Sequence, residues 1–275
     1  MCIIQKTNNV VETTIDDGSR APDFEKMLEN VCIETRQILT VQKMALEALV
    51  AQEGLGDSKE LRVARRVYHQ QLRRCSNAEY LLQLKQGEVC LNLEEVDFVI
   101  LCLDLIQTVD HLMRQSGVRV TFQTGLNSLT MWIDTWKIYK LLLNLIFNNI
   151  RHMQRGDCLH VTLSRQGGGG VVTLWDTSKN LPVDTVKQFG QNSIGTDSGI
   201  TISSELAKLH GGALMFTSPK GKGTIVAVKL PIRNPVTEQY TNVVDHAEAD
   251  SVMSLILTEL SDVLDDRAFS SVYQD

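Results

Sequence analysis

The stretch KLLLNLIFNNIRHM, which runs from Lys140 to Met153, combines an apolar helical pattern with a row of amide side chains. Asn144 and Asn148 are four residues apart, so an α-helix places them on one face. Arg151 and His152 follow on the same polar side. Amide oxygens are good ligands for Mg²⁺, and an arginine can bind phosphates. Taken alone, however, the stretch is better explained by two surface asparagines.

Three further motifs follow along the chain. The strand-like VVTLWD ends in Asp176, whose carboxylate can accept a hydrogen bond from an adenine amino group, although turn aspartates at strand ends are common. In IGTDSGITISSELAKLHGG, Gly195 and Gly199 flank a bend before a helix, whose first backbone amides can hold phosphate oxygens. As a lone glycine signal this motif is weak, and GKGT, residues 221–224, by itself is a hairpin turn.

Together and in this order, the four motifs resemble the ATPase superfamily of gyrase, Hsp90 chaperones, histidine kinases and MutL, and most closely the sensor histidine kinases. Family members read like NLLSNAIKYT, GTGLGLAI, ELVELHGG and GKGTxFxxxLP. This chain reads NLIFNNIRHM, GTDSGITI, ELAKLHGG and GKGTIVAVKLP at the matching places. The resemblance covers about residues 24–232 and implies an ATP-binding domain that uses Mg²⁺.

The resemblance also implies roles for single residues. Asn148 takes the position of the magnesium ligand, and Asn144 lines the same helix face. Gyrase-type relatives carry a water-activating glutamate where Asn144 stands, so this chain resembles the kinase branch rather than a free ATP hydrolase. The other implied ATP-binding positions contact phosphate (Arg151), cover the adenine (His152), read the adenine (Asp176) or lie in the glycine and hairpin motifs (Gly195, Gly199, Thr224).

Two departures from the family pattern weaken the expected nucleotide site. Where the family has Asp-x-Gly-x-Gly, this chain has Ser178 and Asn180 in place of the glycines, which permit positive φ and close approach of the backbone. Asp197 stands where a glycine is usual, and a carboxylate repels a triphosphate unless Mg²⁺ lies between them. We therefore expect weak, magnesium-dependent ATP binding, with a Kd of about 1 mM.

Upstream of these motifs, heptad patterns predict two long helices joined by EGLGDS. The apolar seam of such a hairpin needs a second copy to cover it, so we expect a homodimeric four-helix bundle. On this hypothesis Leu28→Glu or Leu72→Glu yields monomers, whereas Ile33→Glu stays dimeric. The predicted seam positions are Phe24, Leu28, Val31, Thr35, Ile38, Gln42, Ala45 and Leu49, followed by Leu61, Ala64, Tyr68, Leu72, Cys75, Ala78 and Leu82.

The hairpin lacks the expected phosphoacceptor. The family motif resembles VSHELRTPLT, whereas this chain reads VCIETRQILT, so Ile33 occupies the histidine position. Isoleucine cannot accept a phosphoryl group. His69 is the only histidine in the hairpin, and it lies in a basic stretch of the second helix. It is either a displaced phosphoacceptor or part of a solvated polar face, and the second interpretation is favoured for this face, which includes Arg65, Arg66, Arg73 and Arg74.

Composition narrows the remaining possibilities. The net charge of −6 argues against general nucleic-acid binding. The six cysteines show no Cys-x-x-Cys spacing, which suggests reduced thiols. The longest apolar runs are far too short for a membrane span, and the first residues resemble no signal peptide, so we expect a cytoplasmic protein without direct membrane insertion.

The expected fold is α+β, with a long two-helix hairpin followed by a two-layer α/β sandwich of the histidine-kinase ATPase type. We predict a leader (1–22), the hairpin (23–91), the ATP-binding domain (92–233) and an acidic tail (234–275). In that tail, Val252–Leu264 should form an amphipathic helix that docks on the body or binds a partner. Removal of the tail is expected to leave the ATPase-like domain folded.

The functional hypothesis is a homodimeric, histidine-kinase-like signalling protein that cannot phosphorylate itself. It would act by weak ATP binding and by binding a partner such as a response regulator. Whether it is an enzyme stays open at this point. The alternatives are an active kinase that phosphorylates a partner in trans, and a phosphotransfer protein that uses His69.

Overall fold

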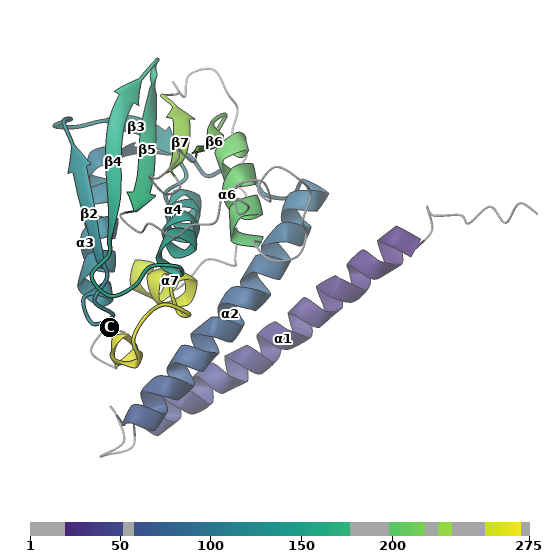
Figure 1. The fold of residues 1–275 in the computed structure, drawn as a ribbon. Coiled ribbons are helices and arrows are strands. Elements are labelled where there is room, and N and C mark those ends of the chain that lie inside the picture. The colour runs from purple at the N-terminus through teal and green to yellow at the C-terminus, as the bar shows by residue number, and fades with distance from the viewer. Residues whose placement is uncertain (1–19, 52–57, 177–197, 218–224, 233–250, 271–275) are drawn as a thin grey trace, which may run out of the picture.

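The computed structural model describes residues 20–51, 58–176, 198–217, 225–232 and 251–270. Two long helices, α1 (Arg20–Val50) and α2 (Lys59–Gln86), lie side by side as a hairpin (Figure 1). The Ser58 side chain caps α2 by accepting a hydrogen bond from the Leu61 amide. At the other end Gly87, with a φ of 71°, turns the chain out of the helix in a conformation that favours glycine.

The face of α1 that is buried in the hairpin differs from the predicted seam. The buried residues of α1 are Cys32, Leu39 and Leu46, none of which belongs to the predicted seam. By contrast Val31 and Ile38, which do belong to it, are 48% and 68% exposed. The predicted seam was expected to pack against a second copy, and the single hairpin leaves these two positions uncovered, so the dimer contact stays a prediction.

A mixed five-stranded sheet and a small ribbon follow the hairpin. The sheet order is β2-β4-β5-β7-β6, in which β2 and β4 are parallel and the other neighbours antiparallel. The ribbon pairs β1 with β3. The strand bounds are β1 (Glu94–Asp97), β2 (Arg119–Thr124), β3 (Thr130–Ile133), β4 (Cys158–Gln166), β5 (Gly169–Asp176), β6 (Ala213–Thr217) and β7 (Ile225–Pro231).

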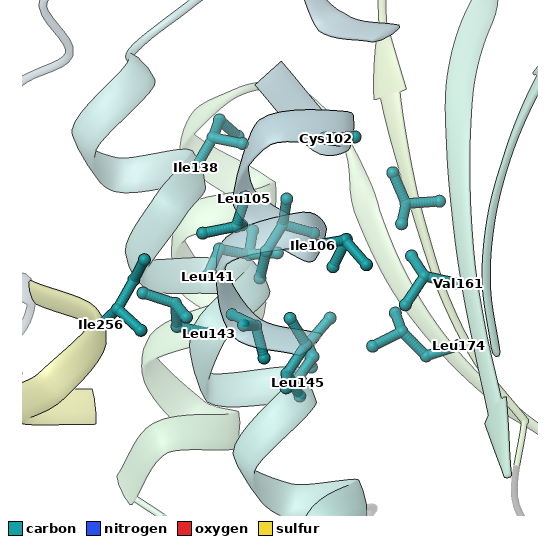
Figure 2. Close-up of a cluster of buried hydrophobic side chains, with 14 of the residues drawn as sticks. Cys102, Leu105, Ile106, Ile138, Leu141, Leu143, Leu145, Val161, Leu174 and Ile256 are labelled. Carbon is teal, nitrogen blue, oxygen red and sulfur yellow. The ribbon is translucent and has the colours of Figure 1, made fainter. Parts of the chain in front are cut away.

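Three helices pack against this sheet, namely α3 (Phe98–Met113), α4 (Thr135–Ile150) and α6 (Ser198–Leu209). Alternate residues of β4, such as Leu159, Val161 and Leu163, are buried, while those between them are half-buried. Figure 2 shows Val161 and Leu174 of the sheet facing side chains from α3 and α4. The predicted α+β fold with its helical hairpin is confirmed.

The C-terminal segment, residues 251–270, is part of this core. It contains α7 (Val252–Glu259) and the short 3-10 helix η2 (Asp266–Phe269). Ile256 is fully buried and lies beside Leu141 and Leu143 of α4 (Figure 2). The helix is shorter than predicted, and apolar side chains are buried on most of its faces rather than on one. Because these side chains are buried against the domain, removal of the tail would expose apolar surface, and the expectation that the domain stays folded without it remains a prediction.

None of the helices in the described part of the chain is both long and apolar enough to cross a membrane.

Candidate functional site

The start of α4 is fixed by Asp134, which comes directly before the helix. The Asp134 carboxylate accepts hydrogen bonds from the backbone amides of Lys137 and Asn92, at 3.1 and 2.9 Å, and pairs with the Lys137 ammonium at 3.0 Å. Its own amide donates to Nε2 of His210 at 3.2 Å. This buried network ties the residues after the hairpin, the start of α4 and the end of α6 together, so the polar row of α4 has a defined position.

Asn144 of α4 contacts Gly199, which belongs to the GTDSGITI motif at the start of α6. Asn144 is completely buried, and a Cβ added to Gly199 would lie 2.4 Å from its Oδ1. The Ser203 hydroxyl of α6 lies within 3.3 Å of the Leu141 carbonyl and 2.8 Å of the Gly199 carbonyl. The N-terminal end of α6 is therefore pressed against the Asn144 side chain. Only glycine fits at this contact, since any side chain would displace the amide.

Buried amide atoms at this contact have no protein partner among the described residues. Neither Oδ1 nor Nδ2 of Asn144 makes a hydrogen bond there, and the same holds for Nδ2 of Asn148. A buried polar atom left without a partner costs about 1–3 kcal/mol, and such atoms are commonly satisfied by a ligand or an ion. The orphaned amides therefore fit a polar group that is bound between the N-terminal end of α6 and the middle of α4.

Asp176, the predicted adenine-reading residue, is the last residue of β5 and is 3% exposed. It lies opposite Leu159 in the antiparallel register of β4 and β5. A carboxylate held at a buried strand end can accept a hydrogen bond from an amino group with little competition from water. The neighbouring Ser178 and Asn180 lie outside the described residues, as do Gly195 and Thr224.

Arg151 and His152 lie where α4 ends. Arg151 is the C-cap residue, and its Nε donates a hydrogen bond to Nε2 of His152 at 2.9 Å. The His152 ring is exposed. Both residues thus lie about one turn beyond Asn148, and their roles toward phosphate and adenine stay predictions.

The described residues contain no group of three or more His, Cys, Asp or Glu side chains that could hold a metal by themselves. A magnesium ion that keeps most of its waters and binds a nucleotide needs only one or two protein oxygens. The Asn148 amide is suited to that task and not to a protein-only cage. If Mg²⁺ binds here, it must arrive with the nucleotide phosphates.

The hairpin positions differ sharply in exposure. Ile33, at the phosphoacceptor position, is 49% exposed on α1. His69 is only 5% exposed, and its Nδ1 lies 2.9 Å from the Thr258 hydroxyl. Burial, together with the charges of Lys43 and Arg65, lowers the pKa of His69 to about 4. A buried ring of this kind is closed to a phosphoryl donor in the observed arrangement.

The predicted solvated face of α2 is also buried in part, which corrects that interpretation. Arg65 and Arg73 are 4% and 8% exposed because the C-terminal segment covers them. The acidic residues of the predicted tail are the ones that meet this face. Glu259, Asp262 and Asp266 recur every three or four residues and meet the arginines of α2.

Comparisons with known proteins agree with this geometry. Residues 133–234 match the family described as histidine kinase-, DNA gyrase B-, and HSP90-like ATPase. An uncharacterised sensor-like histidine kinase of Rhizobium meliloti (strain 1021) is 28% identical over 134 residues, which cover 45% of this chain and 26% of that protein. The crystal structure of full-length ShkA in complex with AMPPNP has a TM-score of 0.57 at 19% identity and covers 75% of this chain and 46% of that one.

A second solved structure, histidine kinase ThkA in complex with the response regulator protein TrrA, has a TM-score of 0.51 at 17% identity. The match covers 78% of this chain and 63% of that one. At such identities the likeness concerns the fold, including the hairpin. The chain spans about a quarter of the length of the Rhizobium relative.

Proposed function

Residues 133–234 form a histidine kinase-, DNA gyrase B- and HSP90-like ATPase domain in a chain similar to sensor histidine kinases, and on this premise we propose that the protein binds ATP with Mg²⁺ weakly and signals without phosphorylating itself. The observation that carries the proposal is the contact between Gly199 and Asn144, together with the unpartnered amide atoms of Asn144 and Asn148 on α4. It offers orphaned polar atoms beside a helix N-terminus, which is a favourable place for phosphate oxygens.

In this proposal Asn148 provides an oxygen to the magnesium ion and Asn144 holds the adjoining polar atoms. Arg151 neutralises phosphate charge, and Asp176 accepts a hydrogen bond from the adenine. A bound ATP would supply a transferable phosphoryl group. Ser178 and Asn180 replace the two glycines that would let the backbone approach the nucleotide closely. The proposed Kd is therefore about 1 mM, which corresponds to a binding free energy of about −4 kcal/mol.

The proposal is tested by titrating a fluorescent ATP analogue with and without Mg²⁺. Wild type should show saturable, magnesium-dependent binding that Asn148→Ala removes. Asn127→Ala is the matched control, because Asn127 is an exposed residue between β2 and β3. Absence of binding at several millimolar analogue would reject the nucleotide site. A micromolar Kd would show that the altered glycine motif does not weaken the site.

Loss of self-phosphorylation follows from Ile33. Labelled ATP should put no acid-labile phosphate on the purified wild type, because an isoleucine side chain has no nucleophile. Ile33→His restores the residue that sensor histidine kinases carry at this position, and label in that variant alone would mean that the nucleotide site still supports transfer. Gln37→His is the control, since Gln37 lies one turn along α1 from Ile33 and is exposed. Label on the wild type would contradict the proposal.

We further propose a homodimer built through α1. Apolar side chains with heptad-like spacing form an exposed stripe on this helix, and an uncovered stripe of this size is typical of an interface. Its members are Phe24, Met27, Val31, Ile38, Val41 and Met44, all between 48% and 68% exposed. ThkA binds the response regulator TrrA, so a response regulator is the kind of partner proposed for this hairpin. The expected cytoplasmic location stays a prediction.

The two alternative functions differ in their support. Phosphotransfer through His69 is disfavoured, because the ring is 5% exposed and packs 5.5 Å, centroid to centroid, from Phe269. Phosphorylation of a partner in trans needs only a working nucleotide site. Transfer of label from ATP to a candidate partner protein, abolished by Asn148→Ala, would favour a kinase that phosphorylates its partner in trans.

A further inference from the structure

The C-terminal segment, residues 251–270, lies between the hairpin and the ATPase domain and contacts both. Figure 1 shows α7 beside α4, and the segment contacts α2 through both α7 and η2. Leu257 and Leu260 are buried in the same apolar core as the helices of the ATPase domain. The segment thus fills a space that neither the hairpin nor the domain closes by itself.

Polar contacts fix the segment along α2. One Nη of Arg65 donates to the Phe269 carbonyl at 3.1 Å. Arg66 donates to the Ser261 carbonyl at 3.1 Å and pairs with Asp266 at 2.9 Å. Together with the contact between His69 and Thr258, these bonds cover successive turns of one helix face. Backbone carbonyls and carboxylates of the segment are therefore matched to the basic face of α2 turn by turn.

A buried ionic junction joins three elements at the centre of this contact. Glu259 of α7 is 1% exposed and accepts from Lys140 of α4 at 2.6 Å and from Arg73 of α2 at 3.2 Å. Lys140 also donates to Oδ1 of Asn77 on α2 at 3.1 Å. Buried charges are stable only while they are paired, and removal of the Glu259 carboxylate takes away the acceptor that Lys140 and Arg73 share, while Arg73 keeps its contact with Asp262 at 3.3 Å. The junction holds only when all three elements are docked.

The same junction touches the helix that carries the nucleotide site. The guanidinium carbon of Arg73 lies 3.6 Å from the centre of the Phe147 ring, and Phe147 directly precedes Asn148. Such a cation–π contact is attractive, and the more so when it is shielded from water. The position of the segment on α2 is therefore coupled, through Arg73, to α4.

We propose that residues 251–270 form an intramolecular clamp that locks the ATPase domain against α2, and that opening of this clamp is required before the domain can move relative to the hairpin. In the closed state α2, α4 and α7 share one ionic junction and cannot separate. In the open state the domain keeps its own sheet and helices, while the basic face of α2 becomes accessible. The contacts of the clamp include no nucleotide, so its test does not depend on whether the protein binds ATP.

The test compares hydrogen–deuterium exchange and small-angle X-ray scattering of full-length Glu259→Gln with those of wild type. Exchange in residues 61–77 and in α7 should become about tenfold faster, and the radius of gyration should increase. The strands β2, β4 and β5 should exchange as in wild type. Glu205→Gln is the matched control, since Glu205 is 41% exposed and pairs with Lys208 on the surface of α6. Unchanged exchange, or faster exchange spread evenly over the sheet, would overturn the clamp.

A second variant keeps the test decisive if Glu259→Gln does not fold. Arg66→Ala removes contacts to the segment alone, and its side chain is 31% exposed, so it leaves the buried junction intact. It should accelerate exchange in α7 and η2 several-fold, whereas Arg74→Ala, at an exposed position of the same helix, should have no effect. Equal behaviour of Arg66→Ala and Arg74→Ala would refute the proposal.

Discussion

Acidification from about pH 7.5 to about pH 5 is expected to destabilise the protein through His69. The pKa of this residue falls from 6.5 to about 4 on folding, because its ring is buried between α2 and the C-terminal segment. The folded state therefore binds fewer protons than the unfolded state at any pH between these values. Stability falls as the pH drops from 6.5 toward 4. Because pH 5 lies about 1.5 pH units below the unfolded pKa, the free energy of unfolding at pH 5 is lower by about 2 kcal/mol.

The measurement is urea unfolding, followed by circular dichroism, of wild type and His69→Gln at both pH values. A glutamine cannot gain a proton in this range, so the variant should lose about 2 kcal/mol less than wild type on acidification. Protein concentration must be held constant, because the proposed dimerisation would contribute to the measured free energy. His152→Gln, at an exposed position, should keep the wild-type dependence. Equal pH dependence for wild type and His69→Gln would refute the argument that burial keeps this ring neutral.

The other predictions concern the contact of α4 with α6 and the face of α1. Gly199→Ala places a methyl group 2.4 Å from Oδ1 of Asn144, so it should cost about 1–3 kcal/mol in urea unfolding and weaken binding of the ATP analogue; unchanged binding would separate Asn144 from the nucleotide site. Ile38→Glu, at a position 68% exposed, should give folded monomers in light scattering. Leu39→Glu, at a position 3% exposed, should unfold the hairpin, and a dimeric Ile38→Glu would reject the proposed interface.

Most elements were predictable because their patterns are local. The helical period in KLLLNLIFNNI recurs in α4, which runs from Thr135 to Ile150, and the strand-like VVTLWD forms the end of β5 at Asp176. The resemblance implied that Asn144 and Gly199 both belong to the nucleotide site, but their direct contact was not predicted and is visible only in the structure. The strand β1 was missed because its sequence, EEVD, is too short and too charged to show a strand pattern.

Tertiary packing explains the remaining errors. The sequence of the basic face of α2 predicts a solvent-exposed surface, because a helix face with four arginines and a histidine is rarely buried. Only the fold reveals that Glu259 and Asp266, almost two hundred residues away in sequence, supply the opposite charges. Likewise, Phe269 has no helical period around it, yet it is fully buried. Such pairings depend on where the chain returns, which no local pattern encodes.

The Asp134 network has a mechanical consequence when it is considered with the position of α2. Asn92, Asp134 and His210 join the end of the hairpin to the start of α4 and the end of α6, so a rotation of the hairpin in the open state would be centred on this junction. The Arg66 contact lies twenty residues along α2 from Gln86, or about 30 Å at 1.5 Å per helical residue. The hairpin is therefore joined to the domain near Asp134 and, about 30 Å away, to the C-terminal segment. When the segment is released, a small rotation near Asp134 would displace the far part of α2 by many ångströms.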